Sequence, residues 1–333
     1  MADKVVLTGV KPTGKVHIGN YIGAIRPALS HAQHFTQSLF FIADYHALTT
    51  IPDPKELKEL TYDVAASWIA AGLDPKKNII YRQSDVHEVF EIFWILSCFS
   101  PKGLMNRAHA YKARVQENEQ EGKSDLDSGV NMGLYNYPIL MASDILSFDT
   151  DLVPVGEDQI QHLEIARDLA QKVNHTYKTQ VLKVPEFSVQ KDAKIVPGLD
   201  GRKMSKSYDN TIPMFMDSAK MRKLVMKIKT DSLPPEAPKS TNDSVIFTLY
   251  KEFANPTQIK DLAMKYETGI GWGDAKQLLF EAMDAHLAPM RDKYLALMSD
   301  KTELDSILAE GAERARLQAR AVLKRVRQSI GMN

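Results

Sequence analysis

The first part of the chain has the order strand, turn, helix, and this order limits the folds that the chain can adopt. Residues 4–9 form a short β-rich run, which leads into the turn-prone sequence Lys-Pro-Thr-Gly at 11–14. Residues 19–32 then read as a helix. The chain therefore begins an alternating pattern of strands and helices.

The pattern continues beyond the first helix. Two further apolar runs, 39–43 and 78–81, read as strands, and each follows a helical segment, of which 55–71 is the clearer. Strands that alternate with helices predict an α/β fold with a parallel sheet and right-handed crossovers. Ligands of such a sheet bind at the carboxyl ends of its strands.

The character of the chain changes after residue 206. Residues 218–230 are helical, a proline-rich break follows at 233–238, and helical patterns run from residue 244 to the end. The last helix, about 303–330, combines apolar positions with many arginines. We expect a domain boundary just past residue 207.

Composition excludes several classes of protein. A chain of 333 residues with 44% hydrophobic residues can build about two domains with a sizeable core. Equal numbers of basic and acidic residues argue against a protein that coats nucleic acid. The single cysteine, Cys98, excludes an internal disulfide and suits a reducing cytoplasm. No apolar run approaches the roughly 20 residues that span a bilayer, so we expect no membrane partner.

The sequence His-Ile-Gly-Asn at 17–20 lies where the first turn meets the first helix. Unpaired backbone N–H groups at a helix start favour bound phosphate. His17 and Asn20, three residues apart, can both donate toward one phosphate, and Gly14 and Gly19 allow a nucleotide to approach the backbone. The alternative is a histidine that only caps the helix or lies on the surface.

A second segment, Lys-Met-Ser-Lys-Ser at 203–207, strengthens the phosphate interpretation. It follows the glycine-containing stretch 197–202, which predicts a mobile loop. The ammonium groups of Lys203 and Lys206 would clamp a triphosphate when the loop closes. A solvated basic loop is the alternative, but two uncommon segments in this order favour the phosphate function.

These two segments resemble the HIGH and KMSKS signatures of class I aminoacyl-tRNA synthetases. Within that class the chain is most similar to tryptophanyl-tRNA synthetases, and the similarity covers nearly its whole length. The segments that carry it are PTGKVHIGNYIGAI at 12–25, ADYHALT at 43–49, YPILMASDIL at 137–146 and VPVGEDQ at 153–159.

The resemblance implies an architecture and an activity. It implies a Rossmann-type catalytic domain at 1–213, a helical anticodon-binding domain at 214–300, a C-terminal helix at 301–333 that packs back on the catalytic domain, and a homodimer. The implied enzyme is a tryptophan–tRNA ligase. Its substrates are ATP, L-tryptophan and tRNA(Trp). Mg²⁺ would be held through the phosphates, with no metal site made by side chains.

The family's functional positions transfer residue by residue. The implied catalytic residues are His17, Asn20, Lys203 and Lys206. The implied ATP site is Lys11, Pro12, Thr13, Gly19, Asn20, Gly156, Glu157, Asp158, Ile195, Lys203, Met204, Ser205, Lys206 and Ser207. The implied tryptophan pocket is His46, Tyr137, Met141 and Asp144.

Two acidic residues in these sets have alternative interpretations. Asp144 lies in the mainly apolar stretch 137–148, where a carboxylate needs a partner; it suits an indole N–H, but an N-cap or an internal salt bridge remains open. Asp158 can accept from a ribose hydroxyl, or Gly156 and Asp158 can form a turn that caps a helix.

The sequence also departs from the family pattern at three places. Asn20 replaces the second histidine of HIGH and still supplies a donor. Lys11 stands where many members have glutamine. In the segment 107–114, Ala110 replaces an amide side chain, which leaves open how the substrate ammonium is held; Lys112 or Arg114 remains a candidate phosphate contact.

Three other functions compete with this one. A tyrosyl-tRNA synthetase would share the scaffold but grip a phenol, and VGEDQ with the Asp144 segment favours tryptophan. A small-molecule nucleotidyltransferase or pantothenate-type ligase would not need the long helical region after residue 213. A non-catalytic relative would not need His17, Lys203, Lys206 and Asp144.

Overall fold

A five-stranded parallel sheet forms the centre of the protein, in a computed structural model that describes residues 4–189 and 195–332. Its strands are β1 (Val5–Val10), β2 (Gln37–Ile42), β3 (Ile79–Arg82), β4 (Leu152–Val155) and β5 (Glu186–Val189). Their order is β3-β2-β1-β4-β5, with every pair parallel. The α/β prediction is confirmed, and the order reverses at β1, which creates a switch point between β1 and β4.

Sequence patterns do not predict strands β4 and β5, and the reason is physical. Each has four residues, and β4 contains Pro154, which cannot donate to a ladder and lowers the strand signal. Pairing with neighbours determines them instead: β4 lies in parallel register with β5 from Leu152 opposite Glu186 onward.

Helices cover the two faces of the sheet and form the opposite end of the molecule. They are α1 (Ile18–Asn20), α2 (Arg26–Ala32), α3 (Asp44–Ala47), α4 (Pro54–Ala70), α5 (Glu88–Phe99), α6 (Lys102–Met105), α7 (His109–Gln120), α8 (Met132–Leu146), α9 (Ile160–Tyr177), α10 (Ser218–Val225), α11 (Val245–Tyr250), α12 (Pro256–Thr268), α13 (Trp272–Ser299) and α14 (Lys301–Ser329). Short 3₁₀ turns are Gln83–Asp85, Glu157–Gln159 and Lys206–Tyr208. Within the described ranges no helix is both long enough and apolar enough to span a membrane.

The helix expected at 19–32 is interrupted by a π-helical turn, Tyr21–Ile25. The amide of Arg26 donates to the carbonyl of Tyr21, five residues back. Pro27 follows in the first turn of α2 and has no N–H to donate, so the regular ladder cannot run through this point. The predicted helix is therefore correct in extent but not in its hydrogen-bond pattern.

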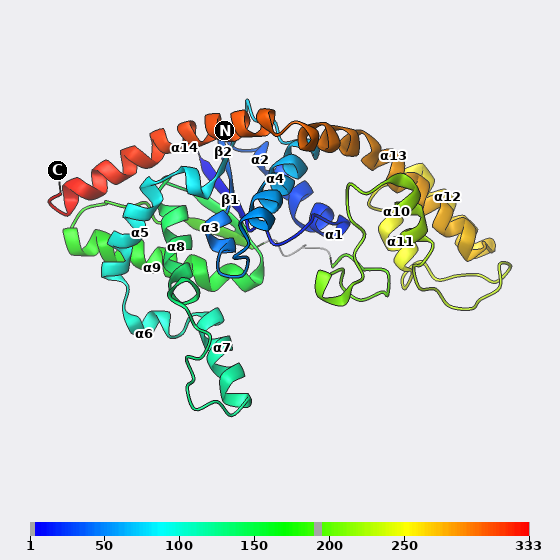
Figure 1. The fold of residues 1–333 in the computed structure, drawn as a ribbon. Coiled ribbons are helices and arrows are strands. Elements are labelled where there is room, and N and C mark those ends of the chain that lie inside the picture. Colours follow the sequence, from blue (N-terminus) through cyan, green and yellow to red (C-terminus); the bar gives the residue numbers. More distant parts are fainter. Residues whose placement is uncertain (1–3, 190–194, 333) are drawn as a thin grey trace.

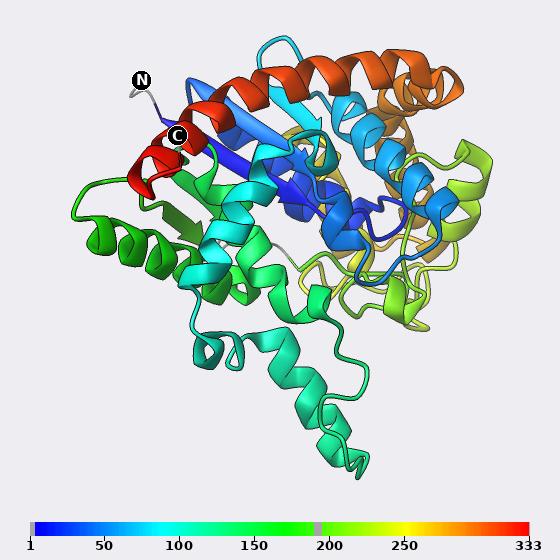
Figure 2. The same ribbon diagram turned by 60° about the vertical axis from the view of Figure 1, so that its left-hand side comes forward.

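The long helix α14 runs back over the sheet beside β3 (Figures 1 and 2). Small residues on one face, Ala312, Ala315 and Ala319, are buried in a core shared with β3 and α5. The guanidinium of Arg314 donates to the carbonyls of Pro75 and Asn78 at 2.9 and 3.1 Å. Small side chains thus let the helix approach the edge strand closely.

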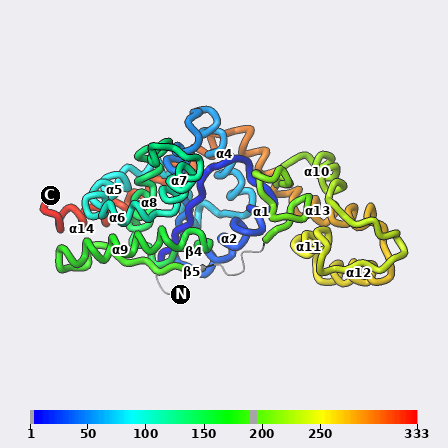
Figure 3. Tube along the Cα trace, turned by 90° about the horizontal axis from the view of Figure 1, so that it is seen from below, coloured from blue at the N-terminus to red at the C-terminus, as the bar shows by residue number. Residues whose placement is uncertain are grey.

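Helices α10 to α13 gather at the opposite end of the molecule from α9, as the view from below shows (Figure 3). Their apolar faces do not form an isolated core. One buried cluster joins Ile18 and Ile22 of the first turn to Met214, Met283 and further residues of the later helices. The domain limits at 213 and 300 remain predictions, and packing across residue 213 is continuous.

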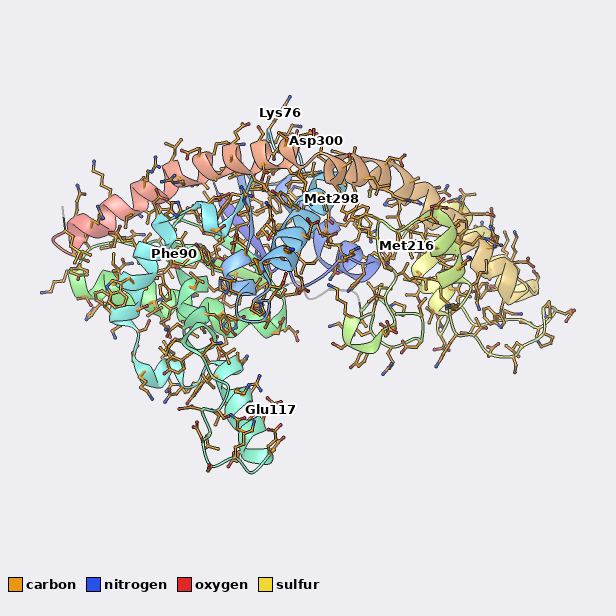
Figure 4. All side chains as sticks on the ribbon, viewed as in Figure 1. Lys76, Phe90, Glu117, Met216, Met298 and Asp300 are labelled. Carbon is orange, nitrogen blue, oxygen red and sulfur yellow. The ribbon has the colours of Figure 1, made fainter. Side chains whose placement is uncertain are left out.

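Helix α7 and the loop after it project from the body as an arm, with Glu117 near its tip (Figure 4). At its base, the side chain of Gln161 accepts from the amide of His109 at 2.9 Å and donates to the carbonyl of Arg107 at 3.0 Å. The arm is therefore fixed to α9 at its root.

Gly311 gives a sharp test of the packing of α14. A Cβ at this position would lie 1.8 Å from the carbonyl oxygen of Ile80. Gly311→Ala should lower the free energy of unfolding by about 3 kcal/mol, as overpacking against backbone does. The matched control is Gly273→Ala in α13, where a Cβ meets nothing within 4 Å. Urea unfolding should find the control neutral or stabilised, and equal stability of both variants would contradict this packing.

Candidate active site

The site lies at the carboxyl ends of the strands on both sides of the switch point. Lys11 follows β1 directly, Ala43 follows β2, and Gly156 follows β4. All three line one cavity of about 560 Å³. This is where parallel sheets bind ligands, as expected from the strand pattern.

His17 and Asn20 form a reciprocal cap at the start of α1. The Nδ1 atom of His17 accepts from the amide of Asn20 at 3.3 Å, and Oδ1 of Asn20 accepts from the amide of His17 at 3.1 Å. Because Nδ1 accepts, the proton of a neutral His17 ring belongs on Nε2, which is left as a donor. The helix cap that the sequence analysis gave as the alternative is therefore present. It leaves the Nε2–H group of the ring available to donate to a phosphate.

Backbone hydrogen bonds join the His-Ile-Gly-Asn turn to residues 212–214, a few positions beyond the Lys-Met-Ser-Lys-Ser segment. The amide of Ile18 donates to the carbonyl of Ile212 at 2.9 Å, and the amide of Met214 donates to the carbonyl of Val16 at 3.1 Å. His17 and Pro213 form an antiparallel bridge between these bonds. Residues that are far apart in the sequence are thus paired like neighbouring antiparallel strands.

Gly14 and Gly19 make room for the second segment. Gly14 has φ of +114°, and a Cβ there would lie 2.9 Å from Nζ of Lys206. A Cβ at Gly19 would lie 3.3 Å from Cβ of Met204, whose sulfur accepts from the Gly19 amide at 3.2 Å. Nζ of Lys206 donates to the carbonyl of Thr13 at 3.3 Å. Both glycines therefore bring the loop 203–207 against the first turn.

Asn210, which the sequence analysis does not single out, holds this loop in shape. Its buried side chain accepts from the amide of Ser205 at 2.8 Å and donates to Asp200 at 2.7 Å and to the carbonyl of Lys203 at 3.1 Å. Ser205 in turn accepts from the amide of Ser207. Lys203 and Lys206 are exposed at the surface of the loop.

A buried carboxyl group, Asp63 of α4, links the first turn to the later helices. It accepts from the amide of Val16 at 3.3 Å and from the hydroxyl of Tyr294 in α13 at 2.6 Å. Burial raises the pKa of Asp63, and these bonds and the positive charges of Lys15 and Lys206 oppose the rise. Tyr294 also stacks on Phe215, with ring centroids 4.2 Å apart.

Three of the four predicted tryptophan-pocket residues, His46, Tyr137 and Met141, line the cavity. Its other walls are largely apolar, with Phe41, Ile145 and Val153 among them. A cavity of this size and lining suits a flat aromatic amino acid.

Asp144 is only 1% exposed and lies behind His46, outside the cavity lining. Its carboxylate is 3.0 Å from Nε2 of His46 and accepts from Nε2 of Gln83 at 2.8 Å. Burial raises the pKa of Asp144, and the bonds from His46 and Gln83 oppose the rise. The internal pair left open by the sequence is present. A carboxylate can accept about four hydrogen bonds, so the bonds from His46 and Gln83 leave capacity for an indole N–H. That contact with indole remains a prediction.

Two of the three departures from the family pattern, Lys11 and Ala110, line the cavity. Nζ of Lys11 donates to Oγ1 of Thr49 at 3.1 Å, and burial lowers its pKa. Ala110 lines the cavity but offers no polar group. Arg114 pairs with Glu117 at 2.7 Å along α7, whereas Lys112 is exposed.

The remaining predicted ATP residues fall in different places. Glu157 and Asp158 are exposed just beyond β4, and Gly156 lies close to them: a Cβ there would meet Oδ1 of Asp158 at 2.7 Å. Ile195 is 72% exposed and lines a separate groove beside α11, with Pro197. The structure thus does not bring Ile195 to the cavity, and its adenine contact remains a prediction.

Pro12 and Thr13 lie in the first turn, with Pro12 buried and Thr13 exposed. Among the described residues no group of three or more His, Cys, Asp or Glu side chains could hold a metal ion.

Comparison with known proteins shows the family to which the chain belongs. The profile of the family described as tRNA synthetases class I (W and Y) matches residues 2–288. With the fold and the paired segments, this defines a class I aminoacyl-tRNA synthetase. The tryptophan–tRNA ligase of Neisseria meningitidis is 47% identical over 333 residues, which cover 100% of this chain and 99% of that protein. The chain belongs to the tryptophan–tRNA ligase family.

Solved structures show the same relationship. A tryptophanyl-tRNA synthetase from Campylobacter jejuni, crystallised with ADP and tryptophan, superposes with a TM-score of 0.89 at 43% identity, over 98% of this chain and 99% of that chain. The tryptophanyl-tRNA synthetase of Mycoplasma pneumoniae superposes with a TM-score of 0.79 at 29% identity, over 99% and 98% of the two chains.

The histidines of the site predict how stability depends on pH. Burial, and then the charge of Lys206, lower the pKa of His17 to about 4 from 6.5. Between these values the unfolded chain binds a proton that the folded chain lacks, so the free energy of unfolding should fall as the pH falls from 6.5 to 4. His162, whose pKa burial also lowers to about 4, acts in the same direction.

Urea unfolding at a series of pH values checks this expectation. His17→Gln should show a smaller fall than the wild type, whereas His34→Gln, at an exposed position, should follow the wild type. Parallel curves for the wild type and His17→Gln would show that His17 is not buried in its neutral form.

Proposed function

We propose that the chain is a tryptophan–tRNA ligase. It activates L-tryptophan with ATP to tryptophanyl-adenylate and pyrophosphate, and then transfers tryptophan to the 3′ end of tRNA(Trp) for protein synthesis. The observation that carries the proposal is the meeting of the His17 turn and the Lys206 loop beside an apolar cavity at the switch point of the sheet. Membership of the family supports the same activity.

In the first step the carboxylate of tryptophan attacks the α-phosphate of ATP in line, and pyrophosphate leaves. The protein has little covalent chemistry to perform, so catalysis depends on position and charge. Neutral His17 donates through Nε2 toward a phosphate oxygen, since its Nδ1 is engaged with Asn20. Asn20 is exposed beside it and retains an amide donor.

Lys203 and Lys206 provide the positive charge. Burial lowers the pKa of Lys206 and the charge of Asp63 opposes this change. Its ammonium already reaches the carbonyl of Thr13, so it lies next to the turn where the phosphates belong. Mg²⁺ bound to the triphosphate would neutralise part of its charge. Glu157 and Asp158, which are exposed and directly follow the cavity-lining Gly156, suit the ribose hydroxyls.

In the second step the 2′-hydroxyl of the terminal tRNA adenosine attacks the adenylate, as class I membership implies. The helices α10 to α13 would bind the anticodon, as the family resemblance implies, and they lie at the opposite end of the molecule from α9 (Figure 3). The formal net charge of zero makes this contact local rather than a general attraction. Loss of charging by a tRNA with a changed anticodon would support it, and full charging would contradict it.

A second copy of the chain is the proposed partner of α5. Trp94 is 68% exposed on this helix, and Phe90, labelled in Figure 4, packs edge-on against Tyr45 with centroids 4.6 Å apart. Such an apolar face suits a homodimer interface. A monomeric mass in sedimentation equilibrium would contradict it.

The cytoplasm is the compartment that holds tRNA and ATP, and cell fractionation tests that location.

ATP–pyrophosphate exchange with each of the twenty amino acids tests the function. Exchange that depends on tryptophan alone is expected. Exchange with tyrosine would indicate the related synthetase, exchange with another small carboxylic acid would indicate a different ligase, and no exchange would indicate a non-catalytic relative.

Lys206→Ala should slow adenylate formation on the order of a hundredfold and leave tryptophan affinity nearly intact, because one donor to the developing charge is lost. Stopped-flow measurement of adenylate formation and calorimetry of tryptophan separate the two effects. Lys223→Ala, at an exposed lysine of α10, is the control and should match the wild type. A loss confined to tryptophan affinity would assign the loop another role.

Asp144→Ala should lower kcat/KM for tryptophan by about 10⁴ and change it far less for phenylalanine, because the buried acceptor that rejects other amino acids is gone. Asp144→Asn retains an oxygen that accepts and should lose less. Exchange kinetics with both amino acids measure the selectivity, and a thermal melt excludes unfolding. A folded Asp144→Ala that keeps its preference would make Asp144 a structural partner of His46 and Gln83 only.

A further inference from the structure

We propose that His162 is a positioning residue for the amino-acid site, which holds the hydroxyl of Tyr137 so that its oxygen accepts from the bound amino acid. The inference rests on the proposed function, because that function places tryptophan in the cavity. His162 is not among the positions that the family resemblance supplies.

The geometry around Tyr137 is the first support. The Nε2 atom of His162 lies 2.9 Å from the Tyr137 hydroxyl, and the two rings meet edge-on with centroids 5.1 Å apart. The Tyr137 ring also meets His46, with centroids 6.1 Å apart and an interplanar angle of 77°. In the described part of the chain, His162 is the only hydrogen-bond partner of that hydroxyl. The tyrosine ring therefore contacts two imidazoles, and its hydroxyl pairs with one of them.

The chemistry of the substrate decides the direction of this bond. The carboxylate of the amino acid must face the α-phosphate, and its other polar groups, the ammonium and the indole N–H, only donate. A tyrosine hydroxyl that serves them must accept, so its own proton must point elsewhere. Nε2 of His162 is the acceptor that takes this proton.

His162 suits an acceptor because it stays neutral. It is 3% exposed in α9, and burial, followed by the charges of His109 and His46, lowers its pKa to about 4. With Nε2 accepting, the ring proton lies on Nδ1, which is buried without a partner among the described residues. An unpartnered buried N–H costs free energy. If this position served packing alone, an apolar residue of similar size would fill it without the cost of an unpartnered N–H.

Four variants separate positioning from packing. His162→Leu removes both nitrogens, His162→Gln keeps a polar group near the place of Nε2, and His162→Asn keeps one near Nδ1. Tyr137→Phe removes the hydroxyl itself. His175→Gln, at an exposed histidine of the same helix, is the matched control. Exchange kinetics with tryptophan and with ATP are measured for each, together with melting temperatures.

The leucine and asparagine variants should raise KM for tryptophan about tenfold, while kcat and KM for ATP change less than about twofold. His162→Gln should restore KM to within about threefold of the wild type. In the Tyr137→Phe background, His162→Leu should add less than about twofold, because no hydroxyl remains to be positioned. The melting temperature of His162→Leu should be unchanged or raised.

Several results would overturn the proposal. They are an unchanged KM for tryptophan in His162→Leu, rescue by asparagine instead of glutamine, independent effects in the double variant, or a lowered melting temperature with both KM values raised. Calorimetry of the wild type with tryptophan separates the two claims. Binding combined with any of these results overturns the role of His162 alone, whereas no binding overturns the proposed function and this inference with it.

Discussion

The antiparallel pairing of residues 16–18 with residues 212–214 is the constraint on which the site depends. It brings Lys206 to the carbonyl of Thr13, a residue 193 positions away in the sequence. Two short polar segments would otherwise lie on separate loops with no common target. Backbone hydrogen bonds fix the relative position of the two segments with little dependence on side chains, and the lysines that we propose for phosphate binding remain exposed.

Packing around the pairing makes it specific. Gly14 and Gly19 allow the loop to approach, and Met204 fills the space beside Gly19. Asp63 connects the amide of Val16 to Tyr294 of α13, so the first turn is also attached to the later helices. The position of the first turn is thereby linked to the part of the protein that we propose for tRNA binding.

Much of this arrangement follows from local sequence patterns. The parallel sheet, the helix start at His17 and the exposed loop with Lys203 and Lys206 depend on residues that are neighbours in the chain. Asn210 and His162 could not be found in this way, since each acts on a partner that is distant in sequence or in a loop without a periodic pattern. Gln83 directly follows the end of β3, so its position could have marked it, but its bond to Asp144 could not be predicted. The place of Ile195 shows the limit of residue transfer, as resemblance cannot show whether a side chain reaches the cavity.

Amide hydrogen exchange of the ligand-free protein, resolved at Ile18 and Met214, tests the pairing most directly. Both amides donate across the junction, to Ile212 and Val16. The account predicts that they exchange slowly and together, in the same range as the core strand β1. Exchange at the rate of an exposed loop would mean that the two segments are not joined before substrate binds, and would contradict the account.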